Sequence, residues 1–198
     1  MKTLVSNGGT PAEAFAVGRV TVAFDGGEGQ KPDFAKFWSE SNKVIRSATG
    51  EMTWDYGREV ITIHAPKTQA VIGKTADGSF QLPGVSASFK TPFVSVIFTP
   101  LDDQPLAQSK RILITALAQD KQAGARYTPD GTRLEATGTA PLLLEPVQAT
   151  LKFAGQKPAQ VRALDHYGVP TGKTVPIGDD GSIVIDGTYR AYYYEVTR

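Results

Sequence analysis

The sequence predicts an all-β chain, an antiparallel β-sandwich of jelly-roll type with little helix. Three observations lead to this fold class. Short runs rich in β-branched and aromatic residues recur at spacings of about 8–12 residues, as in sandwiches and barrels. Among 198 residues, 20 glycines and 13 prolines supply frequent turn signals. Helical periodicity is confined to two short stretches that do not alternate with strands, which argues against a parallel doubly wound sheet.

The N-terminal part is the least regular. Residues 7–11 read Asn-Gly-Gly-Thr-Pro, a composition typical of a flexible linker. We therefore expect residues 1–16 to form a linker or N-terminal segment and residues 17–198 to form a single sandwich domain. Residues 11–16 and 32–38 have the pattern of one or two helical turns. Residues 18–24 alternate and predict a strand that ends at Asp25-Gly26-Gly27.

The remaining predicted strands are alternating or β-branched runs, and several end at a proline or an Asp-Gly pair. They cover residues 59–65, 68–73, 93–98, 111–117, 148–153, 160–164, 182–185 and 191–196. The runs 93–98 and 111–117 are apolar at most positions, which is typical of central strands buried on both faces. The runs 148–153 and 160–164 alternate, as half-exposed strands do.

Charge and composition exclude several partners. The chain has 21 Lys and Arg against 20 Asp and Glu, so it lacks the positive excess that binds nucleic acid. It has no cysteine, which excludes disulfides and thiolate chemistry. No stretch approaches 18 consecutive apolar residues, so we expect no membrane span. Residues 1–6 lack the apolar core of a signal peptide, so the chain either stays inside the cell or belongs to a longer secreted protein.

Catalytic and metal-binding signals are weak. His64 lies in a strand and His166 in a turn, and neither has a serine on a strained strand–helix elbow to activate. Residues 168–174 are one residue short of a phosphate-binding loop, and a proline interrupts them. Aspartates at 102–103 and 179–180 fit ordinary turns, with a structural calcium ion as the open alternative. We therefore expect no catalytic residue and no cofactor.

Aromatic residues are the remaining candidates for binding. Sugar rings stack their apolar faces on tryptophan and tyrosine, and Trp38, Trp54, Tyr56 and Tyr127 could serve this purpose. Trp54 shares a strand face with Tyr56, because residues two apart in a strand point the same way. The alternative is that these side chains belong to the core or anchor a loop.

Five segments share an order with a known group of proteins. They are residues 47–55 (Ser-Ala-Thr-Gly-Glu-Met-Thr-Trp-Asp), 60–73, 106–116, 138–147 and 194–196. This order resembles the C-terminal β-sandwich modules that follow the catalytic barrel of bacterial glycoside hydrolases acting on plant or algal polysaccharides. The resemblance covers most of residues 44–196. A catalytic barrel needs roughly 250 residues, so the resemblance implies a non-catalytic role.

The resemblance completes the functional expectation. We expect a carbohydrate-binding module that recognises a β-linked polysaccharide of the cellulose, β-glucan, mannan or xylan type. It would be secreted as part of a larger protein, with an upstream catalytic domain as its partner. The four aromatic residues would stack on sugars, and Asp55, Arg58 and Arg126 would bind hydroxyl groups. The alternative is a structural accessory domain that packs on the barrel and binds no sugar.

Overall fold

The computed structural model describes residues 13–21, 24, 33–75 and 77–198. Strands hold 49% of this part of the chain and helices 4%. All strand pairs in it are antiparallel. The prediction of an all-β, antiparallel, sandwich-like fold with little helix is confirmed.

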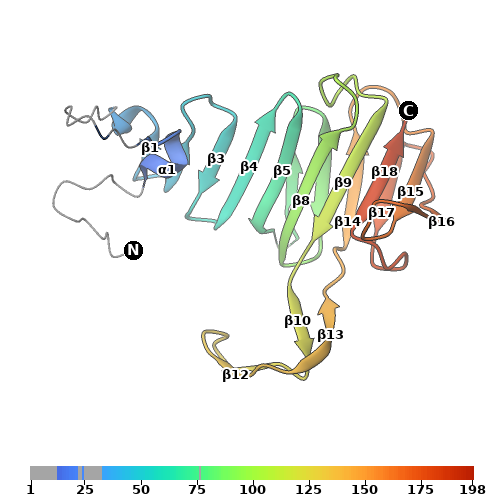
Figure 1. The fold of residues 1–198 in the computed structure, drawn as a ribbon. Helices are drawn as coiled ribbons and strands as arrows, with labels where there is room; N and C mark the ends of the chain where they lie inside the picture. The colour runs from blue at the N-terminus through green and yellow to red at the C-terminus, as the bar shows by residue number, and fades with distance from the viewer. Residues whose placement is uncertain (1–12, 22–23, 25–32, 76) are drawn as a thin grey trace.

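A ten-stranded sheet forms the larger layer (Figure 1). In order across the sheet, its strands are β1 (Trp38–Ser39), β2 (Val44–Arg46), β3 (Met52–Asp55), β4 (Val60–Ala65), β5 (Thr68–Lys74), β8 (Phe93–Pro100), β9 (Arg111–Leu117), β18 (Tyr193–Thr197), β15 (Gln160–Leu164) and β16 (Pro170–Thr174). Most neighbours in the sheet are also neighbours in the sequence. The exceptions are β5 and β8, which pair directly, and the C-terminal strand β18, which lies between β9 and β15.

A four-stranded sheet packs behind one part of the larger layer (Figure 1). Its order is β17 (Ser182–Ile185), β14 (Ala149–Phe153), β7 (Val85–Phe89) and β6 (Ser79–Gln81). Strand β14 shows the pattern that drives the packing, because its buried residues alternate with exposed Thr150 and Lys152. Phe153 meets Phe98 of β8 edge to face, with ring centroids 5.9 Å apart. The core lies between these two sheets.

A two-stranded extension, which we call the arm, comprises residues 118–146 and projects away from the sandwich (Figure 1). It contains β10 (Asp120–Ala123), β11 (Arg126–Tyr127), β12 (Leu134–Ala136) and β13 (Thr139–Leu144). Strand β10 pairs with β13, and β11 pairs with β12 nearer the tip. None of the arm's residues is buried, so the arm has no core of its own.

The N-terminal part differs from expectation at one strand. The predicted helical turns exist as α1 (Ala14–Val17) and the 3-10 helix η1 (Phe34–Lys36). The predicted strand at 18–24 is wrong where it can be checked, because residues 18–21 and 24 form no strand pairing. Alternation alone does not make a strand without a neighbouring edge to pair with. Residues 1–12 of the expected linker lie outside the described residues, and α1 contacts β2. Neither described helix has the length or apolar character to cross a membrane.

Candidate functional site

Three of the four predicted aromatic residues form a cluster at the β1–β3 end of the large sheet. The Trp38 indole nitrogen donates a hydrogen bond of 3.1 Å to the Tyr56 hydroxyl. Trp54 meets Tyr56 edge to face, with ring centroids 6.0 Å apart and planes at 66°. All three side chains are half-buried. The rings are therefore partly accessible, but they do not form one flat stacking platform.

The predicted polar partners lie elsewhere. Asp55 follows Trp54 on β3 and faces the opposite side of the sheet, where its cross-strand neighbour Val60 belongs to the core. Its carboxylate accepts a hydrogen bond of 2.9 Å from the backbone nitrogen of Arg58. The Arg58 guanidinium lies 5.8 Å from the centre of the Phe80 ring, on the small sheet. Asp55 and Arg58 thus stabilise the turn between β3 and β4 and do not face the cluster.

Arg126 and Tyr127 lie on the arm, where they form strand β11. Tyr127 is 49% exposed. Figure 1 shows that the arm leaves the sandwich beyond β9, whereas β1 and β3 lie at the far end of the large sheet. The predicted site residues therefore occupy three places: the cluster, the β3–β4 turn and the arm. Trp38 and Tyr127 each belong to a two-residue strand.

The outer face of the large sheet, opposite the small sheet, is apolar. Directly paired residues on neighbouring strands share a face, so the strand registers give two rows across it. The first row is Trp38, Ile45, Trp54, Ile61, Ile72, Ser95 and Leu117. The second row is Met52, Ile63, Ala70, Ile97, Thr115, Tyr193 and Leu164. Only three of these fourteen residues are buried, namely Ile45, Ala70 and Leu164, and none of the three belongs to the core between the sheets.

These rows cross seven strands, a distance of about 29 Å at the usual strand spacing. The two rows together outline a strip of about 400 Å², which is an upper bound on its exposed apolar area because Ser95 and Thr115 are polar and three residues are buried. Apolar patches of a few hundred Å² on a soluble protein are often functional. Within the described part of the chain, no further sheet covers this face. Sequence reasoning anticipated central strands buried on both faces at 93–98 and 111–117. The structure buries their inner side chains and leaves outer ones such as Ile97 and Leu113 half-exposed.

A charged row borders the apolar rows. The Glu195 carboxylate, whose side chain is 5% exposed, accepts hydrogen bonds from Arg111 at 2.7 and 2.9 Å and from Arg162 at 2.6 Å. Burial opposes ionisation of Glu195, but the hydrogen bonds from Arg111 and Arg162 outweigh it and keep the pKa of the carboxyl below its ordinary value. The row is therefore ionic at neutral pH and sets one boundary of the apolar area.

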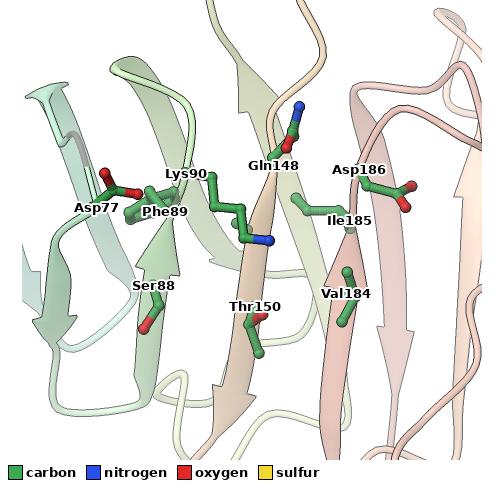
Figure 2. A pocket seen from close by; sticks show the side chains of 10 residues that line it. Asp77, Ser88, Phe89, Lys90, Gln148, Thr150, Val184, Ile185 and Asp186 are labelled. Atoms are coloured by element: carbon green, nitrogen blue, oxygen red, sulfur yellow. The ribbon is translucent and has the colours of Figure 1, made fainter.

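The outer face of the small sheet has the opposite character. Ser88, Thr150 and Val184 stand side by side on β7, β14 and β17 (Figure 2). They line a shallow groove of about 370 Å³, together with Asp77, Phe89, Lys90, Gln148, Ala149, Ile185 and Asp186. Val184 is the one large apolar residue exposed among the groove's lining. This face is that of an ordinary half-exposed antiparallel sheet, polar toward water.

Catalytic and metal-binding groups do not gather in the described part of the chain. It holds no cluster of three or more histidine and carboxylate side chains that could bind a metal ion. Asp102 accepts hydrogen bonds from the backbone nitrogens of Gln104 and Lys110, and Asp180 accepts from Ser182, as turn residues do. His64 is an exposed residue of β4.

Comparison with known protein families, with curated proteins and with solved structures finds no match.

Proposed function

We propose that this chain is a non-catalytic accessory module that packs the outer face of its large sheet against a neighbouring folded domain. The observation that carries the proposal is the pair of apolar rows from Trp38 and Met52 to Leu117 and Leu164. An antiparallel sheet that faces water on one side has polar residues there, as the small sheet does. On the resemblance to modules that follow a glycoside hydrolase barrel, we propose that the neighbour is a secreted catalytic domain in the same polypeptide.

The absence of cysteine from the sequence allows a direct test. Ile61→Cys places a single thiol on the outer face of the large sheet, and Thr150→Cys places one on the outer face of the small sheet as a matched control. The rate of maleimide labelling is measured for each variant in two proteins, the isolated chain and the longer polypeptide that also carries the catalytic domain. Any cysteines of the catalytic domain are replaced first. We expect the Ile61→Cys thiol to label at least tenfold more slowly in the longer polypeptide, and the Thr150→Cys thiol to label equally in both. Equal labelling of the Ile61→Cys thiol in both proteins would overturn the proposal.

Recognition of a β-linked polysaccharide is a second candidate, favoured by the half-exposed cluster of Trp38, Trp54 and Tyr56. Three rings that contribute about 1 kcal/mol each would give about 3 kcal/mol together, which corresponds to a dissociation constant of about 6 mM. Affinity electrophoresis of the isolated chain through gels containing soluble glucan, mannan or xylan tests this binding. The proposal is supported if the gels retard the unaltered chain and Trp54→Ala abolishes the retardation. Tyr167→Ala is the control and should be retarded like the unaltered chain, because Tyr167 is an exposed aromatic residue outside the cluster. Unchanged migration in every gel would reject it.

A further inference from the structure

Strand β13 carries the most exposed apolar sequence of the arm. Leu142, Leu143 and Leu144 are 58%, 45% and 48% exposed, and they follow one another without a polar residue between them. In a strand, Leu142 and Leu144 point to one face and Leu143 to the other. Both faces of the arm therefore carry exposed leucine at this point, and the paired residues of β10 are the polar Asp120, Lys121 and Gln122, which do not bury them.

The free edge of β13 is available for hydrogen bonding. The backbone nitrogen of Glu145 donates to the carbonyl of Gln119, which makes Gln119 and Glu145 a hydrogen-bonded pair. Bonded and non-bonded pairs alternate along an antiparallel ladder, so Leu143 also bonds toward β10. The peptide groups of Leu142 and Leu144 then point away from β10, toward the side on which the structure describes no further strand.

Four other edges of the fold are protected. Exposed edge strands usually carry charges or proline, or are very short. Strand β10, on the opposite edge of the arm, carries Asp120 and Lys121, and β16 begins with Pro170 and contains Lys173. Strands β1 and β6 have two and three residues. By contrast, the three leucines that follow Pro141 in β13 carry no charge and face an open edge.

We infer that β13 pairs with β13 of a second copy of this chain, antiparallel and about a two-fold axis at Leu143. This register places Leu142 opposite the partner's Leu144 in two hydrogen-bonded pairs, and Leu143 opposite the partner's Leu143. Pro141 and Pro146 flank the paired segment and limit its length. The two-fold axis pairs leucine with leucine at all three positions and opposes no like charges, so the edge is complementary to itself.

The face of the arm that carries Leu143 is hollowed. A hollow of about 460 Å³ lies there, lined by Gln119, Lys121, Tyr127, Leu143 and Glu145 together with Asp120 and Leu144. The partner's Leu143 would stand across the edge from Leu143, with Cα atoms about 4.5 Å apart as in any non-hydrogen-bonded pair. Its side chain would lie on the face that carries this hollow.

A charge exchange at position 143 tests both the partner and the register. Sedimentation velocity over a micromolar to millimolar concentration range should find the unaltered chain in reversible equilibrium with a dimer. Leu143→Lys alone and Leu143→Glu alone each place like charges opposite one another, and each should raise the dissociation constant of the dimer at least tenfold. An equal mixture of the two variants should recover dimerisation, because the two-fold axis then pairs opposite charges. Leu134→Lys, at an exposed leucine near the arm's tip, is the matched control and should dimerise normally.

Three results would overturn the inference. The unaltered chain could remain monomeric up to millimolar concentration, which would leave the edge to another partner. Leu143→Lys could dimerise as well as the unaltered chain. A mixture of the two charged variants could fail to recover the dimer, which would place the contact on another surface. Ile61→Lys, on the outer face of the large sheet, should leave the dimer unchanged and so separates this inference from the proposed packing on a neighbouring domain.

Discussion

Two isoleucines on neighbouring strands provide the sharpest test of which face of the large sheet is covered. Ile114 of β9 is fully buried in the core, whereas Ile97 of β8 is half-buried on the outer face. Replacing either with alanine removes the same three carbons. For Ile114, losing the hydrophobic burial of three carbons lowers the free energy of unfolding by about 2.4 kcal/mol. The cavity left in a close-packed core increases this loss to about 3–4 kcal/mol. For Ile97 no enclosed cavity forms, and the cost should be about 1 kcal/mol or less.

The measurement is thermal and urea unfolding of the isolated chain, followed by circular dichroism. At this chain length 1 kcal/mol corresponds to about 2–4 °C, so Ile114→Ala should lower Tm by roughly 6–16 °C and Ile97→Ala by about 4 °C at most. The urea midpoint should move without a change in slope. Equal losses in the two variants would mean that the isolated chain itself covers the outer face. The proposed packing of that face on a neighbouring domain would then be wrong.

Three further predictions concern stability. Gly73→Ala should lower the free energy of unfolding, measured in urea, more than Gly172→Ala does. Both glycines have a positive φ. Of the two, only Gly73 lies where an added Cβ would overlap a backbone atom, the carbonyl oxygen of Glu59. Equal losses would contradict that overlap. Because hydrogen bonds from two arginines keep the pKa of Glu195 below 4.5 despite burial, stability should fall as pH drops below about 4.5, and Glu195→Gln should flatten this acid limb of the stability curve. An unchanged acid limb would count against the ion pairs. Burial, with smaller effects of nearby charges, raises the pKa of Tyr194 to about 12, so stability should decline as pH rises from 10 toward 12. Tyr194→Phe should remove that decline, and an equal decline in both proteins would assign it to other groups.

The strand content was predictable because it depends on local patterns. The runs 59–65, 68–73, 93–98 and 111–117 coincide with β4, β5, β8 and β9 within two residues at each end. Their β-branched residues and terminal turns are local signals. The arm was not predictable in this way, since β10 to β13 pair only with one another and bury no apolar residue that would mark them in the sequence.

The candidate site was only partly predictable from the sequence. Trp54 and Tyr56 share a face as expected, and the structure adds Trp38 through a contact 18 residues away in sequence. Asp55 lies between Trp54 and Tyr56, so alternation alone places it on the opposite face. The separation of Tyr127 from the cluster depends on the arm's path, which no local pattern specifies.

The size of the apolar face bears on the kind of partner it suits. Burying a strip of about 400 Å² would gain at most about 10 kcal/mol before costs. Association of two free molecules costs about 4–15 kcal/mol in lost translational and rotational freedom, so this face alone would support only weak binding to a free partner. A neighbour in the same polypeptide avoids most of that cost, because the linker holds it at a high effective concentration. The charged row of Glu195, Arg111 and Arg162 then contributes orientation, since an ionic boundary beside an apolar area penalises sliding or rotation of the two surfaces. The face is thus large enough to hold a tethered domain in one orientation and too small to recruit a free one tightly, which is what a structural accessory module requires.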